Sequence, residues 1–339
     1  MFNNNKFADY LKSHDEYHQA QTAKFVKNLK DFQSFLEKRG VKSEHDITKK
    51  DINDYVAEKN AQGEDAYHYI ETIIEYFISV KNGVLSHEAW LLYDAVGHFG
   101  KISELTKNEL GEDAWRQVFG NTELPKFGWT LDEITDFTRQ MHKRVSAVAP
   151  REHVENMIQL HAHGVEQHFD GTIHEILESR GVDGLIKHLN DEFIKEVESC
   201  RDKGIFYSGS MVDDDVINFY KENPLNRRVG NKIINKQPPS LAKEYLVETD
   251  EKLKRYNACH CAIKKHSILQ NDGGLSHSLC YCCFGHSKKQ FEAAFGRELS
   301  GRVVKTVMDD GCLECVFEID IPEGVAGKNC SACNAPCNR

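Results

Sequence analysis

The chain has 339 residues, of which 40% are hydrophobic and 28% charged, and its formal net charge is −10 at pH 7. This length suffices for two or three domains and for a substantial core without disulfide bonds. The negative charge argues against generic nucleic-acid binding, which depends on clustered lysine and arginine, and no apolar run reaches the roughly 18 residues of a membrane span.

The first residues, MFNNNKFADYLKSHDEYH, contain no apolar stretch typical of a secretory signal. We therefore expect a cytoplasmic protein that has no contact with membranes. In a reducing compartment, the eleven cysteines are better explained as metal ligands, reactive thiols or buried apolar residues than as disulfides. Ten of them follow residue 258, so the sulfur chemistry is local.

The amino-terminal residues predict helices. Apolar residues recur at helical spacing over 7–38, in one long helix or two short ones, and over about 65–81. Between them, Thr48 followed by Asp51 predicts the capped start of a short helix. The stretches FQSFLEKRGVKSEHDITKKDINDYVAEKN and YIETIIEYFISVKN resemble the SAM-like core-binding domain of tyrosine recombinases. That resemblance implies a small helical bundle, and it makes a DNA-associated helical protein the third of our functional hypotheses.

The middle of the chain continues helical. Thr130 with Glu133 predicts the start of a helix over about 131–147. Residues 151–180 are expected to form one long helix, which carries five histidines: His153, His161, His163, His168 and His174. His161 and His168 lie seven residues apart and share a face, so they are the candidate catalytic residues, as general bases beside a pocket. The alternative is that these histidines are solvated or structurally hydrogen-bonded.

An acidic triplet follows at 213–215, after a loop or short strand over 204–212. It could bind a divalent cation through oxygen ligands, but an N-terminal cap for the helix that follows explains it more simply. A helix over 241–256 then leads into the cysteine-rich region.

Cysteines with metal-ligand spacing form the most informative stretch of the sequence. Cys259 and Cys261 make one Cys-x-Cys pair, and Cys280 and Cys282 make a second. Two close pairs separated by a loop can bring four thiolates to one ion, and such a set suits zinc or a [4Fe–4S] cluster. Free thiols, buried or redox-active, are the alternative. Further candidate ligands of a mixed site lie nearby: His260, His266, His277 and Cys283.

A β-hairpin is predicted next, because RVVKTVM and CVFEIDI alternate on either side of an Asp-Asp-Gly turn. Cys312 and Cys315 sit at this turn as Cys-x-x-Cys and are alternate ligands. Three further cysteines, Cys330, Cys333 and Cys337, lie in a tail that could cap the first metal or hold a second.

The stretch FGRELSGRVVKTVMDDGCLECVFEIDIP resembles the carboxy-terminal part of the 4-vinyl reductase (hydrocarbon-binding) domain superfamily, with Cys315 and Phe317 at matching positions. The segments YNACHC and LCYCCFGHSKK are similar to those of uncharacterised bacterial cysteine-rich proteins. The resemblance implies an α+β fold for about residues 230–323, with a small-molecule pocket over an antiparallel sheet.

Together these observations predict an α+β protein in which a large helical region precedes a small α+β module. The expected domains are a helical bundle (1–120), a helical region with the histidine-rich helix (121–230), the cysteine-rich module (231–323) and a tail (324–339). The leading functional hypothesis is a metal–thiolate enzyme with a small-molecule ligand. The alternative is a ligand- or redox-sensing interaction protein, and a homo-oligomer is compatible with either.

Overall fold

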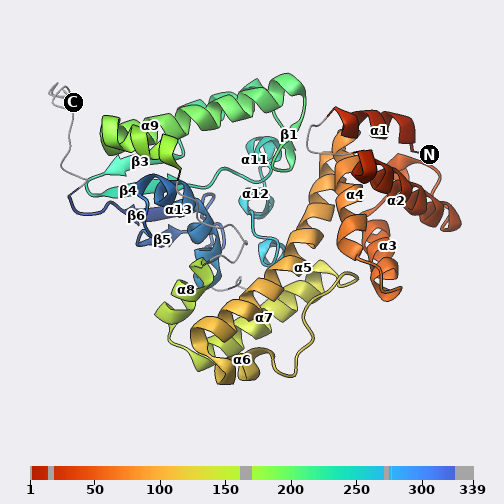
Figure 1. Ribbon diagram of the computed structural model, residues 1–339, viewed down its shortest axis with the longest axis horizontal. Helices are drawn as coiled ribbons and strands as arrows, with labels where there is room; N and C mark the ends of the chain where they lie inside the picture. Colours follow the sequence, from red (N-terminus) through yellow and green to blue (C-terminus); the bar gives the residue numbers. More distant parts are fainter. Residues whose placement is uncertain (1, 14–18, 161–169, 271–274, 276, 325–339) are drawn as a thin grey trace.

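The computed structural model describes residues 2–13, 19–160, 170–270, 275 and 277–324. Most of these residues are helical, and a small antiparallel sheet lies toward the carboxy-terminal end (Figure 1), so the predicted α+β class is confirmed. The α-helices are α1 (Asn4–Lys12), α2 (Gln19–Lys38), α3 (Lys49–Ala61), α4 (Ala66–Ser79), α5 (Gly83–Leu110), α6 (Glu112–Phe119), α7 (Leu131–Val148), α8 (Arg151–Gln159), α9 (Gly171–Lys203), α10 (Asp214–Glu222), α11 (Ala242–Val247), α12 (Glu251–Ala258) and α13 (Tyr281–Phe295). The short 3₁₀ helices are η1 (Glu44–Asp46), η2 (Lys265–Ile268) and η3 (His277–Cys280).

The amino-terminal helices pack through aromatic residues. Phe32 of α2 contacts Tyr55 of α3, with ring centroids 4.9 Å apart, and Phe7 of α1 meets Tyr76 of α4 edge-on at 5.5 Å. Helix α5 extends from this bundle to α6 and α7 (Figure 1). Its buried side therefore packs against both the amino-terminal bundle and the region that holds the cysteines.

Two of the predicted helix starts are confirmed by their capping hydrogen bonds. The Thr48 side chain accepts from Asp51 N, and the Asp51 carboxylate accepts in return from Thr48 N at 3.0 Å. Thr130 and Glu133 make the same reciprocal pair at the start of α7. These side chains satisfy backbone N–H groups that have no partner within the first turn of a helix.

The sheet has four antiparallel strands in the order β3-β4-β6-β5. The predicted hairpin is present, because Val303 of β5 pairs with Phe317 of β6, and a bulge follows between Val303 and Lys305. A second hairpin, which the sequence analysis did not predict, precedes it in the chain, and the expected domain boundary at residue 230 falls in its turn. The strands are β3 (Asn226–Val229), β4 (Lys232–Lys236), β5 (Gly301–Lys305) and β6 (Val316–Asp320), and a separate two-stranded ribbon joins β1 (Phe206–Tyr207) to β2 (Ser210–Met211).

The expectation of one histidine-rich helix over 151–180 is wrong. Helix α8 ends at Gln159, where Leu160 has an extended backbone with φ −84° and ψ 99°. A new helix begins after Asp170, whose carboxylate accepts hydrogen bonds from the N–H groups of Thr172 and Ile173. The Asp-Gly-Thr sequence at this point is a helix start, but the apolar residues on both sides of it keep helical spacing and so suggested one continuous helix. His161, His163 and His168 lie outside the described residues.

One other segment differs from the sequence-based expectation in the same way, whereas the acidic triplet agrees with its simpler explanation. The helix expected over 241–256 is two helices, α11 and α12, because Glu248 is extended and Asp250 caps α12 through a hydrogen bond from Leu253 N. The acidic triplet acts as a cap, with Asp213 Oδ1 accepting from Val216 N at 3.1 Å. The simpler explanation of that triplet is thus supported.

A single hydrophobic core connects the helical region with the sheet. It runs from Phe7 of α1 through Phe99 of α5 to Phe284 of α13 and Phe317 of β6. A smaller core surrounds α10 and contains Cys200. No described helix is both long enough and apolar enough to cross a membrane.

Candidate metal centre and adjoining pocket

Six cysteines from three segments gather between α5, α13 and the sheet. Cys259 and Cys261 follow α12, and Cys315 directly precedes β6. The other three, Cys280, Cys282 and Cys283, lie at the start of α13. Burial raises the pKa of five of these thiols, Cys259, Cys261, Cys282, Cys283 and Cys315. The sulfur atoms therefore lie in a dry environment that disfavours an unpaired thiolate.

Four of the six cysteines line one small cavity of about 20 Å³: Cys259, Cys280, Cys283 and Cys315. Cys280 and Cys283 are separated by two residues at the first turn of a helix, so their side chains lie on the same face. The Cys280-x-x-Cys283 spacing is visible in the sequence, but the Cys-x-Cys pattern drew attention to Cys282 instead. The cavity thus includes two of the four expected ligands, Cys259 and Cys280, and two of the alternates, Cys283 and Cys315.

A buried lysine lies among these sulfur atoms. The Lys264 side chain is 1% exposed, and its Nζ donates a hydrogen bond to Cys280 Sγ. Desolvation lowers the pKa of Lys264, but the attraction of Cys280, Cys261, Cys283 and Cys259 outweighs it and raises that pKa well above its usual value. An ammonium group at this depth requires a negative partner, and the groups at hand are the cysteine sulfur atoms.

Arg255 fixes the loop that carries Cys315. Its guanidinium donates to the backbone oxygens of Val307 at 2.7 Å and Met308 at 2.9 Å, and to Asp310 Oδ1 at 2.8 Å. The Val307 N–H in turn points at Cys315 Sγ, 3.5 Å away. Because Arg255 lies on α12, one side chain links the helix before Cys259 to the loop before Cys315.

Cys282 faces away from the cavity, toward the helical region. Its Sγ is 3.2 Å from Nε2 of His98 on α5, and His98 Nδ1 is 3.5 Å from Asp94 Oδ1. Both His98 and Cys282 are buried. His98 could not be identified from the sequence, because 184 residues separate it from Cys282 and a histidine among the apolar residues of α5 resembles any other core residue.

A second buried lysine lies beside the cluster. Lys265 Nζ is 3.0 Å from His87 Nε2 on α5 and sits 4.5 Å from the centroid of the Tyr256 ring. Desolvation lowers the pKa of Lys265 to about 8 and that of His87 to about 2. Adjacent lysines therefore have different surroundings, because Lys264 contacts sulfur and Lys265 contacts an imidazole.

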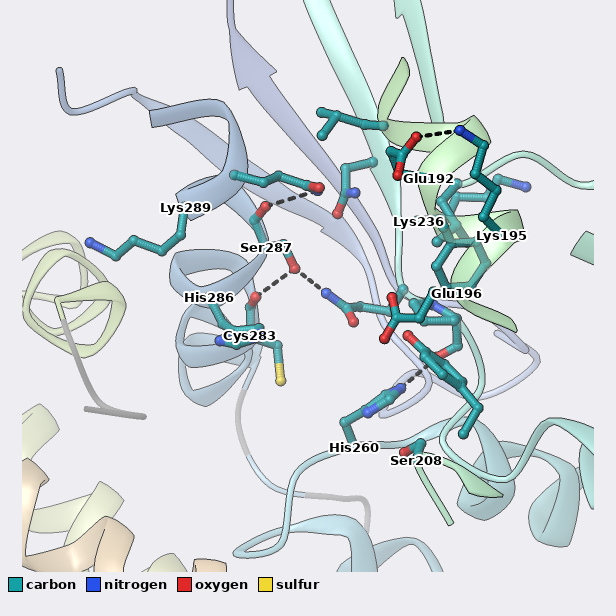
Figure 2. A pocket seen from close by; sticks show the side chains of 18 of the residues that line it. Glu192, Lys195, Glu196, Ser208, Lys236, His260, Cys283, His286, Ser287 and Lys289 are labelled. Carbon is teal, nitrogen blue, oxygen red and sulfur yellow. Dashed lines mark hydrogen bonds and ion pairs between the residues drawn. The ribbon is translucent and has the colours of Figure 1, made fainter. Parts of the chain in front are cut away.

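An open pocket of about 960 Å³ adjoins the cysteine cavity. Its walls come from α9, the β1 turn, the end of β4 and α13, and Cys283, His260 and Gln237 line both the pocket and the small cavity. Figure 2 shows the Cys283 sulfur and the His260 ring on the same side of this space. Desolvation lowers the pKa of His260 to about 4, and its Nε2 donates to the Pro238 oxygen at 2.5 Å.

Gln237 lies where the pocket and the cavity meet. Its side-chain amide donates to Ser287 Oγ on α13, and its backbone N–H donates to the Cys315 oxygen at 3.1 Å. Ser287 Oγ itself donates to the Cys283 oxygen at 2.8 Å. This chain of hydrogen bonds holds the two cysteine-bearing segments together at the edge of the pocket.

The remaining candidate ligands have other partners. His266 Nε2 is 2.9 Å from Asp132 on α7, and His277 Nε2 is 2.8 Å from Asp309. Cys312 does not line the cavity among the described residues. Within those same residues, no group of three or more His, Cys, Asp or Glu side chains already stands at metal-coordination geometry. The thiols lie near one another, but as they are placed in the described residues they do not form a set that could hold a metal ion.

Comparison with known proteins identifies no similar protein. No protein-family model matches the chain, and neither a curated protein nor a solved structure is significantly similar to it. The two sequence resemblances therefore stay predictions, and the functional argument depends on the geometry of the cysteine cavity and the pocket.

Proposed function

We propose that the protein binds a thiophilic metal, zinc or an iron–sulfur cluster, through Cys259, Cys280, Cys283 and Cys315, next to a pocket for a small organic molecule. The observation that carries this proposal is the cavity that these four side chains line, drawn from three separate segments of the chain. Four thiolates are a complete donor set for tetrahedral zinc and for a four-iron cluster.

The buried lysine fits such a centre. Four thiolates around a divalent ion leave a net negative charge, and the Lys264 ammonium lies beside the sulfur of one of them. Hydrogen bonds to the sulfur atoms and nearby charge are known to tune thiolate centres. Lys264 would thus offset part of the charge, and Val307 N–H would do the same at Cys315.

The adjoining pocket would bring a substrate next to this centre. Because Cys283 borders both spaces, a molecule in the pocket would contact the edge of the metal site. A bound metal would supply Lewis-acid or electron-transfer chemistry, and His260 and His286 would accept or return protons at the pocket wall. Desolvation lowers the pKa of both histidines and so favours their neutral form. A sensor would use the same pocket for recognition without turnover.

The test is to purify the protein without oxygen and to measure zinc, iron and acid-labile sulfide together with the visible spectrum. Stoichiometric zinc indicates a zinc site, whereas iron with sulfide and a broad absorption near ~400 nm indicates a cluster. Cys280→Ser with Cys283→Ser should abolish metal binding. Cys200→Ser is the matched control, because Cys200 is a buried cysteine of the other hydrophobic core.

A second pair of variants distinguishes between the two alternative sets of cysteine ligands. Cys261→Ser with Cys282→Ser removes the two cysteines that do not line the cavity, and this variant should keep its metal. If it loses the metal while Cys283→Ser with Cys315→Ser retains it, the two Cys-x-Cys pairs are the ligands. Metal-free, folded wild-type protein would contradict the proposal and favour thiol-based redox sensing.

A further inference from the structure

We infer that the ligand of the large pocket carries a positively charged or hydrogen-bond-donating nitrogen, that is, a small organic amine with an apolar or aromatic body. The inference rests on the small-molecule half of the proposed function and concerns the wall made by α9 and β4. It depends on two acceptor groups there, Asn235 and Glu196, and on the aromatic rings beside them.

A chain of amides fixes the orientation of Asn235. Asn190 Oδ1 accepts from Asn226 N at 3.1 Å, and this backbone donor defines which Asn190 atom is oxygen. Asn226 Nδ2 also donates to Asn190 Oδ1 at 3.1 Å, so the Asn226 oxygen is left to accept from Asn235 Nδ2 at 2.7 Å. This chain of hydrogen bonds therefore ends at Asn235, and the Asn235 side-chain oxygen takes no part in it.

Among the described residues, the Asn235 oxygen has no hydrogen-bond partner, and the residue, which lines the pocket, is only 3% exposed. An unpartnered buried acceptor costs about 1–3 kcal/mol unless a water or a ligand supplies a donor. A ligand N–H at this wall would satisfy it after a small movement of the side chain. The neighbouring Asn226 amide prevents Asn235 from flipping to present a donor instead.

Glu196 supplies a negative charge to the same wall. Its carboxylate points into the pocket in Figure 2, and among the described residues it has no ion-pair partner. It lies close enough to Tyr207 to contribute, after desolvation, to the raised pKa of that phenol. A ligand ammonium would form a charge-assisted hydrogen bond with the exposed Glu196 carboxylate at the pocket wall.

The lysines that line the pocket are each paired with a carboxylate, although two of these carboxylates also pair with a second lysine. The pairs are Lys195 with Glu192 at 2.7 Å, Lys236 with Glu314 at 2.8 Å, and Lys289 with Glu292 at 3.4 Å. The Lys289 ammonium also points away from the pocket in Figure 2.

Aromatic residues complete the wall. Phe193 and Tyr207 meet edge to face with centroids 5.6 Å apart, and Trp90 lines the pocket from α5. Aromatic faces attract cations and also pack against apolar bodies. An amine attached to a hydrocarbon or aromatic group matches this combination better than a carboxylate does.

The experiment compares three probes that share one ring: benzylamine, which is a cation at pH 7, neutral benzyl alcohol, and benzoate. Each is titrated into the full chain while protein NMR signals are followed. We expect benzylamine to bind about tenfold more tightly than the other two. Glu196→Gln and Asn235→Leu should each reduce this preference by about threefold to tenfold.

The control is Glu175→Gln, an exposed residue of α9 that does not line the pocket, and this variant should keep the preference. If the Asn235 variant fails to fold, Glu196→Gln still decides the question, because Glu196 is exposed. Equal binding of all three probes, or tighter binding of benzoate, would overturn the amine inference and leave the pocket itself intact. Binding of none would contradict the small-molecule half of the proposed function as well, while metal analysis tests the other half separately.

Discussion

Lys264 donates a hydrogen bond to the sulfur of Cys280 at a depth where neither side chain contacts bulk water. The charge state of the Lys264 amine and that of the neighbouring cysteine sulfur atoms depend on each other. Burial alone would favour a neutral amine and neutral thiols, so a charged Lys264 implies a negative sulfur centre. A metal-bound thiolate of the proposed centre would supply that negative charge, and so would a thiolate that binds no metal.

Replacing Lys264 with methionine tests that dependence. In metal-free, reduced protein the change should leave the free energy of unfolding unchanged or raise it by about 1 kcal/mol, because a buried charge is costly and methionine fills the same space. Zinc affinity, measured by competition with a chromophoric chelator, should fall about tenfold because the counter-charge is lost. Lys187→Met, on an exposed lysine of α9, is the control.

A different result would identify another state of the cysteines. If Lys264→Met lowers the unfolding free energy of the metal-free protein by more than about 3 kcal/mol, the ammonium already pairs with a thiolate without any metal. The site would then be a stabilised thiolate, and the proposed metal centre would lose its main electrostatic argument.

Much of this centre could be predicted from the sequence, and the rest could not for a definable reason. The concentration of cysteines near Cys259 and Cys280 is a local pattern, and so is the hairpin that places Cys315. The contacts of Cys282 with His98, and of His87 with Lys265, join residues about 180 positions apart, and only the packing of α5 against the cysteine region brings them together. The choice of Cys283 over Cys282 depended on the helical start of α13, which turns residues three apart to the same side.

Arg255→Met should destabilise the protein by about 2–4 kcal/mol, because the buried oxygens of Val307 and Met308 lose their charged donor. The same change should reduce metal content, since the loop that carries Cys315 loses its anchor. Denaturant unfolding and metal analysis measure the two effects. Arg255→Lys should recover little, because a lysine cannot supply the forked geometry of the guanidinium.

The exposed Arg302 of β5, which pairs with Glu318, provides the comparison. Arg302→Met should change stability by less than about 0.5 kcal/mol, as expected for a surface ion pair. If Arg255→Met were equally mild, the link between α12 and the Cys315 loop would have no energetic importance.

Gly285 of α13 packs directly against the backbone at the end of α8. A β-carbon on this residue would collide with the Gln159 oxygen and would lie 2.8 Å from its carbonyl carbon and 2.9 Å from its Cα. These are backbone atoms that cannot turn aside, so Gly285→Ala should cost about 1–3 kcal/mol, even though alanine favours helices. Gly100→Ala on α5, where nothing lies within 4 Å, should instead stabilise the protein by about 0.5–1 kcal/mol. Unfolding curves that move both variants in the same direction would contradict this packing.

The buried His87 should make the free energy of unfolding depend on pH. Desolvation first, and then the nearby Lys265 and His260, lower the pKa of His87 to about 2 in the folded protein, against an ordinary value of 6.5. Between these two pH values the unfolded chain binds a proton that the folded chain does not, so stability is highest above pH 6.5 and falls as the pH decreases. From pH 7 to pH 5 this one group should lower the free energy of unfolding by about 2 kcal/mol.

His87→Gln, which keeps an acceptor for Lys265, should remove that part of the slope, whereas the exposed His153→Gln should retain it. If the His87 variant and the wild type lost stability equally over this range, the imidazole would already be protonated or solvated in the folded protein, and the buried contact between α5 and Lys265 would be wrong.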